Sequence, residues 1–96
     1  MIDAKSLEDR VLEALASPQR RKILSTLVKA YPKALTVTEL QRALGVPRTT
    51  LWHHLRVLRD AYLVELNGSR RGFRARYRAL HLYFNGERLH VEGVSP

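Results

Sequence analysis

The stretch TVTELQRALGVPRTTLWHHLRVLRD, residues 36–60, decides the fold. Thr36 is followed three residues later by Glu39, which is the spacing of a capping box at the start of a helix. Gly45 comes directly after the last apolar residue of that helix, where a left-handed cap is favoured, and Pro47 opens a second helix. Two short helices joined by the turn Gly45-Val46-Pro47 have the spacing of a helix-turn-helix.

The second of these helices, residues 48–60, has two different faces. At about 100° per residue, three leucines fall on one side and predict the core face, which Tyr62 extends if the helix continues: Leu51, Leu55 and Leu58. The opposite side carries Thr49, His53 and Arg56. Small or hydrogen-bonding side chains on an exposed face suit the reading of base edges, whereas an ordinary solvated face is the alternative.

Two further helices are predicted upstream of this stretch. Ser6 is a plausible N-cap for a first helix within residues 1–16, where Leu7, Val11 and Leu15 recur at helical spacing. Ser17-Pro18 ends that helix and begins the next, since Ser caps well and Pro is favoured at the first helical position. The apolar stripe of the second helix contains Ile23, Leu24, Leu27 and Val28.

Downstream, residues 62–80 are predicted to form a β-hairpin wing. A strand around residues 63–66 is followed by a turn rich in glycine, and from Phe73 to Ala79 the chain alternates arginine with apolar or small residues, as in a half-buried strand. Asn85-Gly86 predicts another hairpin within the C-terminal extension, residues 81–96. The expected fold is therefore α+β: a single winged helix-turn-helix domain over residues 1–96, with about four helices, a wing and an extra C-terminal hairpin.

Basic charge is concentrated in the middle of the chain. The net charge is +8, from 17 Lys and Arg against 9 Asp and Glu. Residues 41–80 hold nine arginines and two acidic residues and so carry +7 of it. Such a concentration is the electrostatic footprint of a polyanionic partner. Cysteine is absent, which excludes disulfides and thiolate metal sites, and no apolar run approaches the length of a membrane span.

The quoted residues resemble a known family. SPQRRKIL at 17–24, LGVPRTTLWHHLRVLRDA at 44–61 and the following Leu63-Val64 are similar to ArsR-type winged-helix transcriptional regulators, over roughly residues 6–80. The resemblance implies a homodimer on a palindromic operator, with the helix at 48–60 in the major groove. Three features depart from it: Tyr62 replaces a residue tolerant of left-handed backbone, Pro47 replaces a capping Ser, and the Cys motif of metal sensors is missing.

The candidate DNA-binding residues lie on the second helix of the motif and on the wing. Trp52 either contacts thymine methyls and sugar or covers the rim of the core, and Arg48 contacts either phosphate or guanine. The wing arginines have no acidic residue near them from Asn67 to Phe84, which favours contact with phosphates or the minor groove. The candidates are Arg48, Thr49, Thr50, Trp52, His53 and Arg56 on the helix, and Arg70, Arg71, Arg74, Arg76 and Arg78 on the wing.

Other residues keep more ordinary roles. Leu7, Val11 and Leu15 belong either to the core or to a dimer interface, and the sequence does not separate the two. His54 lies near the core stripe and is interpreted as a packed histidine whose ring nitrogen is bound to backbone. The adjacent pair His53-His54 points in different directions on a helix and is no metal pair. No metal and no cofactor are expected.

The sequence therefore predicts a transcriptional regulator that binds double-stranded DNA specifically, as a homodimeric repressor. It is expected in the cytoplasm at the nucleoid, without a membrane partner. A protein-interaction module and a non-specific nucleoid or RNA-binding protein are the alternatives. An enzyme is disfavoured because no paired carboxylates, Ser/His/Asp set or metal cluster is recognisable.

Overall fold

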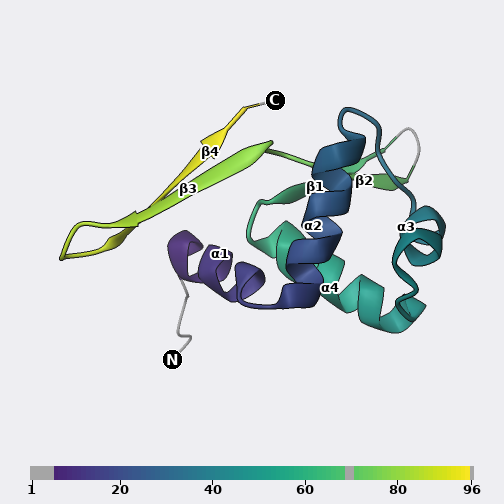
Figure 1. The fold of residues 1–96 in the computed structure, drawn as a ribbon, viewed down its shortest axis with the longest axis horizontal. Coiled ribbons are helices and arrows are strands. Elements are labelled where there is room, and N and C mark those ends of the chain that lie inside the picture. The colour runs from purple at the N-terminus through teal and green to yellow at the C-terminus, as the bar shows by residue number, and fades with distance from the viewer. Residues whose placement is uncertain (1–5, 69–70, 96) are drawn as a thin grey trace.

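The computed structural model describes residues 6–68 and 71–95, in which four helices are followed by two β-hairpins (Figure 1). The helices are α1 (Leu7–Leu15), α2 (Pro18–Ala30), α3 (Val37–Leu44) and α4 (Arg48–Asp60). Strands β1 (Val64–Asn67) and β2 (Gly72–Ala75) pair antiparallel as the wing, and β3 (Ala79–Phe84) and β4 (Leu89–Val94) pair antiparallel as a C-terminal hairpin. The predicted α+β winged helix-turn-helix with an extra hairpin is confirmed.

The sequence signals at the helix ends act as predicted. The Ser6 and Ser17 hydroxyls accept hydrogen bonds from the amides of Asp9 and Arg20, each at 3.2 Å. Thr36 and Glu39 form the complete capping box, with Thr36 N–H donating to Glu39 Oε1 at 2.9 Å and Glu39 N–H donating to Thr36 Oγ1 at 3.1 Å. Gly45 ends α3 with φ 67°, a left-handed conformation that glycine adopts without cost. Together these caps fix the boundaries of the helix-turn-helix.

The core lies among the four helices and the wing. Leu51, Leu55 and Leu58 of α4 are fully buried, so the predicted core face of this helix is confirmed. They pack in one cluster with Ile23 and Leu27 of α2. Burial of a leucine side chain stabilises the fold by about 1.5–3 kcal/mol. This cluster therefore fixes the orientation of α4 and, with it, of the helix's outer face.

Two backbone contacts attach the wing to the body. Leu35, just before α3, forms an isolated antiparallel bridge with Phe73 of β2, with N···O distances of 2.9 and 2.7 Å. Gly72 is needed beside this bridge, since a Cβ on it would lie 3.0 Å from the carbonyl carbon and oxygen of Leu35. The wing is thereby held against the start of the helix-turn-helix.

The long basic strand predicted from Phe73 onward is wrong in its second half. Strand β2 ends at Ala75, after which the Arg76 amide donates to Leu63 O at 3.0 Å and the chain leaves the wing. Ala79 begins β3, which pairs with β4 and not with β1. Phe73 and Ala75 are buried as expected, but Ala79 is exposed. The wing therefore spans 64–75, and residues 79–80 belong to the C-terminal hairpin.

The C-terminal hairpin turns at the predicted Asn85-Gly86. The Asn85 side-chain oxygen accepts from the amides of Glu87 and Arg88 at 3.1 and 3.2 Å, which closes the turn. In Figure 1 this hairpin projects beyond α1, at the opposite end of the molecule from α3 and the wing turn. None of the helices within the described residues has the length and hydropathy that a membrane crossing requires.

Helix α4 ends at Asp60, so Tyr62 does not extend its core face as the sequence suggested. Tyr62 takes the left-handed conformation, φ 59°, and its side chain is 59% exposed. Such a conformation is uncommon for a residue with a side chain as large as tyrosine. The position needs a left-handed residue, as the family resemblance implied, and this chain fills it with tyrosine.

Candidate nucleic-acid interface

The outer face of α4 is open to solvent along its length. Thr49, His53 and Arg56 are exposed, as are Arg48 and Thr50 in the first turn. Arg56 makes no hydrogen bond or ion pair within the described part of the chain. The opposite face is fully buried, so the helix has no freedom to rotate about its axis. These side chains form a row of donors and acceptors that is held in a fixed direction.

The start of α4 lacks the side-chain cap that the other helices have. Pro47 occupies the N-cap position and provides no acceptor, so the first amides of this 13-residue helix have no side-chain partner. Arg48 lies beside these amides and donates to Thr38 Oγ1 of α3 at 3.3 Å. Free amides at a helix N-terminus, together with a guanidinium, attract phosphate.

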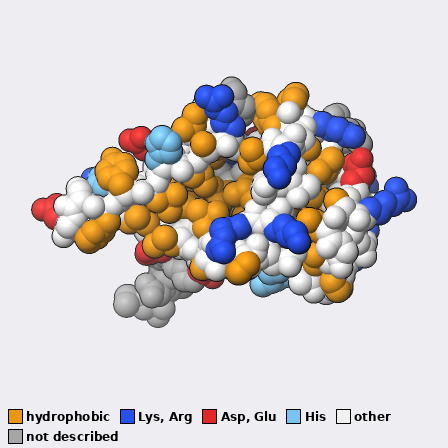
Figure 2. Space-filling view, viewed as in Figure 1, with side chains coloured by type: hydrophobic (Ala, Val, Ile, Leu, Met, Phe, Trp, Pro, Cys, Tyr) orange, Lys and Arg blue, Asp and Glu red, His pale blue; other side chains and the backbone are white. Residues whose placement is uncertain are grey.

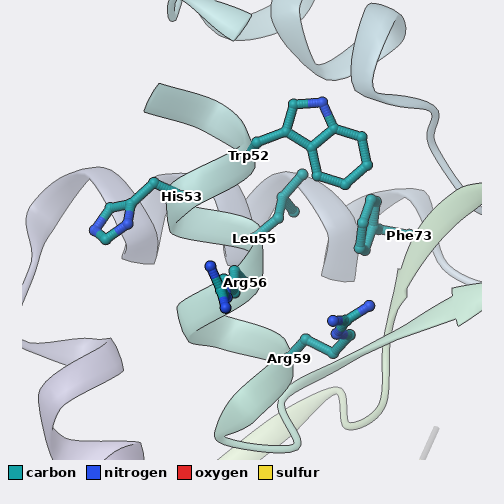
Figure 3. A pocket seen from close by; sticks show the side chains of 6 residues that line it. All are labelled: Trp52, His53, Leu55, Arg56, Arg59 and Phe73. Carbon is teal, nitrogen blue, oxygen red and sulfur yellow. The ribbon is translucent and has the colours of Figure 1, made fainter. Parts of the chain in front are cut away.

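An open pocket of about 310 Å³ lies between α4 and the wing (Figure 3). Trp52 and Arg59 lie on the β2 side of the helix, and the indole meets Phe73 edge to face, with ring centroids 5.7 Å apart. His53 points to the other side of the helix, at the rim of the pocket. Trp52 remains 46% exposed. It thus covers the rim of the core with one edge and leaves the rest of the ring exposed to solvent.

Arg59 was missed by the sequence reasoning. It lines the same pocket as Arg56, one turn further along α4, and no partner of its guanidinium lies within residues 6–68 and 71–95. The helical spacing of Arg56 and Arg59 was a usable signal, because residues three apart share a face. Trp52, Arg56 and Arg59 therefore form one continuous surface facing the wing.

The wing arginines are not all free. Arg74 donates to Glu65 Oε1 from Nε at 3.0 Å and from Nη2 at 2.6 Å, and Arg76 Nη1 lies 3.7 Å from Glu65 Oε2. The hydrogen bond to Glu65 raises the pKa of Arg74 above its ordinary value. No acidic residue occurs from Asn67 to Phe84, but Glu65, just upstream of that range, faces Arg74 across the hairpin. The outer face of the wing is therefore less basic than predicted.

The other three arginines predicted for the wing are Arg70, Arg71 and Arg78. Arg71 is exposed at the end of the turn, with φ 54° and no partner for its side chain within the described residues. Arg70 lies outside the described residues. The prediction that Arg78 belongs to the wing is wrong. Arg78 follows the end of β2 and lines a groove beside Leu15 and Leu24, away from the wing. Its assignment to the wing fails because the strand ends at Ala75.

His54 joins α4 to the other helices through Arg20. Arg20 Nη1 lies 3.2 Å from His54 Nδ1, and the same guanidinium donates to the carbonyls of Ala14 and Glu13 at the end of α1. The partner of His54 is thus a side chain and not the predicted backbone group. A guanidinium only donates, so Nδ1 must accept and the ring must be neutral. Burial, then the charge of Arg20, then His53, lowers the pKa of His54 below 6.5.

This pKa shift predicts a stability that depends on pH. Below about pH 6.5 the unfolded chain binds a proton at His54 that the folded chain does not bind. The free energy of unfolding therefore decreases as the pH is lowered, until the pKa of the folded state is reached. His54→Asn keeps an acceptor for Arg20 and removes the titration, so we expect a flatter profile. Urea unfolding between pH 7.5 and 5 measures it. Equal slopes for the variant and the wild type would contradict the assignment.

The three residues predicted to lie in either the core or a dimer interface differ in how deeply they are buried. Val11 is 2% exposed and belongs to the core of the single chain, so it is not available to a partner. Leu15 is half-buried against the same cluster. Leu7 is exposed, as is its neighbour on the helix, Leu12. Of the three proposed residues, only Leu7 and part of Leu15 therefore offer apolar surface outside the core.

Charge is distributed unevenly on the surface. On the face in Figure 2, Lys and Arg side chains lie mainly over the helices and the wing, whereas the C-terminal hairpin shows hydrophobic, histidine and acidic side chains. No group of three or more His, Asp or Glu in the described ranges is arranged to hold a metal ion. A basic surface around an exposed helix of a helix-turn-helix is the arrangement that binds a DNA duplex.

These features define a winged helix-turn-helix transcriptional regulator, and comparison with known proteins agrees. A family profile described as "Helix-turn-helix domain" matches residues 15–67. The transcriptional repressor PagR of Bacillus anthracis is 34% identical over 95 residues, which cover 97% of this chain and 84% of that protein. The chain belongs to this family of DNA-binding transcriptional regulators, and the resemblance to ArsR-type winged-helix proteins is confirmed.

Proposed function

We propose that the protein is a repressor that binds a palindromic operator as a homodimer. The observation that carries this proposal is the outer face of α4, which presents Thr49, His53 and Arg56 to solvent while the leucines behind them are fully buried. Placed in the major groove, such a face reads donors and acceptors of base edges. Thr50, at the side of this face, is assigned a supporting contact near the start of the helix.

A second set of residues is proposed to bind phosphate. The free amides at the start of α4 and Arg48 meet one phosphate, and Arg59 meets another from the pocket that separates α4 from the wing. Arg71 reaches the backbone or the minor groove from the end of the wing turn, and the same role is proposed for Arg70, which lies outside the described residues. Arg74 and Arg76 act as weaker contacts because Glu65 already neutralises part of their charge. Trp52 packs against sugar or a thymine methyl from the same surface.

Repression follows from binding itself. The relative in Bacillus anthracis is named a transcriptional repressor, and a protein that occupies an operator blocks access of RNA polymerase. The site of action is then the nucleoid in the cytoplasm, and no catalytic step is involved. Phosphate contacts supply much of the affinity and make it dependent on salt, whereas base contacts supply the specificity.

Selection of bound duplexes from a random pool tests the proposal. We expect a palindromic consensus with half-sites separated by about one helical turn, ~34–36 Å between recognition helices. A monomeric binder would yield a single half-site. A pool without any consensus would show non-specific binding and would replace this proposal with that of a nucleoid protein.

A further inference from the structure

We propose that two copies of the chain associate through the C-terminal hairpin, with the β3 strands side by side and antiparallel. This inference rests on the proposed homodimer and assigns its interface. The resulting sheet has the strand order β4-β3-β3-β4, and Phe84 of each copy enters an apolar groove of the other.

The hairpin has one apolar face that is only half covered by its own chain. Leu80, Leu82 and Phe84 alternate along β3, opposite Gly93, Val91 and Leu89 of β4, and so share one face. At the base of the hairpin, Leu80, Leu82 and Val91 pack against the core. At the tip, Phe84 is 68% exposed, more than any other large hydrophobic side chain in residues 6–68 and 71–95. The apolar face thus continues beyond the body that covers it.

A groove of about 220 Å³ lies beside the base of the same hairpin. Its lining is mainly apolar and comes from Leu15 at the end of α1, Leu24 and Val28 of α2, and Leu80 and Leu82 of β3, with Arg78 as its charged member. Each copy therefore carries both an exposed phenyl ring and an apolar groove. Such a pair is self-complementary under a two-fold axis, in which each copy gives and receives the same contact.

The free side of β3 can supply the pairing. Among the described residues, β3 forms ladder hydrogen bonds only with β4, so its other side is unpaired. An unpaired strand is a template for pairing with another chain, and a two-stranded hairpin by itself is marginal in water. Addition of the second hairpin completes a four-stranded sheet.

The apolar face restricts the register of the two β3 strands. Directly opposed residues of antiparallel strands point to the same face, so the two apolar faces coincide only when an even-numbered residue lies opposite an even-numbered one. Near the middle of β3, a two-fold axis at Leu82 places Phe84 opposite the partner's Leu80, at the mouth of the groove. An axis at His81 would place Phe84 opposite Arg78. Leu80 and Arg78 both border the groove, and the axis at Leu82 is assigned because it sets the ring against an apolar side chain and not against a guanidinium.

Charge favours a second copy as the occupant. Residues 79–95 contain Glu87, Arg88 and Glu92 and carry −1, so the rest of the chain carries +9. Two chains that each carry +8 repel one another least where the hairpins meet. The hairpin also projects from the end opposite the wing turn and α3 (Figure 1), so this association leaves both α4 helices accessible to DNA.

Phe84→Asp tests the interface. The side chain is exposed in the single chain, so the thermal midpoint of a monomer should not depend on it, but the short aspartate side chain cannot replace the apolar contact that the phenyl ring makes in the groove. In sedimentation equilibrium at tens of micromolar, without DNA, we expect a dimer for the wild type and a monomer for the variant. Tyr83→Asp is the matched control, because Tyr83 is 48% exposed on the opposite face of the same strand. It should remain a dimer, and equal behaviour of the two variants would overturn the assignment.

Leu82→Cys tests the register, since the chain has no cysteine of its own. Residues on the two-fold axis have Cα atoms about 4.5–5.5 Å apart, within the range of a disulfide. We expect oxidation to link this variant into a covalent dimer, whereas Tyr83→Cys, which lies opposite position 81, should link far less. Equal linking of both variants would exclude the axis at Leu82.

The outcomes separate this interface from the proposed function. A wild-type monomer, with and without operator, would remove the homodimer and the interface together. A wild-type dimer that survives Phe84→Asp would remove the interface alone. A monomeric Phe84→Asp that still prefers one half-site duplex over a scrambled duplex would support both proposals.

Discussion

Alanine at Thr49, His53 or Arg56 is expected to lower the affinity for the cognate operator while the affinity for scrambled DNA changes little. A lost base-edge contact costs about 1–3 kcal/mol on the cognate site, which is roughly 5- to 150-fold in affinity. The buried face of α4 keeps the helix in place, so these exposed substitutions remove the contact and not the fold. The ratio of cognate to scrambled affinity should therefore fall.

Arg71→Ala is the matched control on the wing. Phosphates are alike in every sequence, so this variant should weaken binding to both duplexes equally, and each lost phosphate contact should reduce the log-log salt slope by roughly 0.9. Arg74→Ala should have a smaller effect, because its guanidinium already donates twice to Glu65. The measurement is the affinity for both duplexes at several salt concentrations. Parallel losses in the α4 variants would show that this face binds phosphate alone.

The helical part of the fold could be predicted because its signals are local. Capping at Thr36 depends on Glu39 three residues away, and the end of α3 depends on the backbone freedom of Gly45 alone. The core face of α4 follows from the spacing of its leucines. Each of these features is decided within one or two turns of chain, so no knowledge of distant contacts was needed.

The prediction of the wing is wrong where the structure depends on residues that are distant in the sequence. The alternation from Phe73 to Ala79 is that of one continuous strand, but β1 offers partners only as far as Val64, opposite Ala75. After Ala75 the chain needs a new partner and finds it in β4, where Ala79 pairs with Val94 fifteen residues further along the sequence. Arg78 was thereby assigned to the wrong surface.

The sequence predicts which candidate residues are exposed, but it does not predict their side-chain partners. Exposure of Thr49, His53 and Arg56 follows from helical periodicity, which a sequence displays directly. The contact of Arg74 with Glu65 depends on the register of the hairpin, and that of His54 with Arg20 crosses 34 residues. Such pairings determine which basic groups are free for DNA, and periodicity carries no information about them.

Phe73→Ala is expected to have the largest effect on stability. Phe73 is 2% exposed, bridges to Leu35 through its backbone and packs its ring against Trp52, so it connects the wing, the start of α3 and α4. Removal of a buried phenylalanine side chain costs about 3–5 kcal/mol, out of about 5–15 kcal/mol for a whole domain. For a chain of this size, each kcal/mol lowers the thermal midpoint by roughly 4–8 °C.

Thermal unfolding of Phe73→Ala, beside Tyr83→Ala as an exposed aromatic control, measures this loss. The control should stay within about 0.5 kcal/mol of the wild type, as surface substitutions usually do. Binding at a temperature where Phe73→Ala is still folded then separates stability from function. Without the Phe73 ring, Trp52 is no longer held at the rim of the pocket, so the affinities for the cognate and the scrambled duplex should fall together. A variant with the thermal midpoint of the wild type would show that Phe73 does not hold the wing against α4.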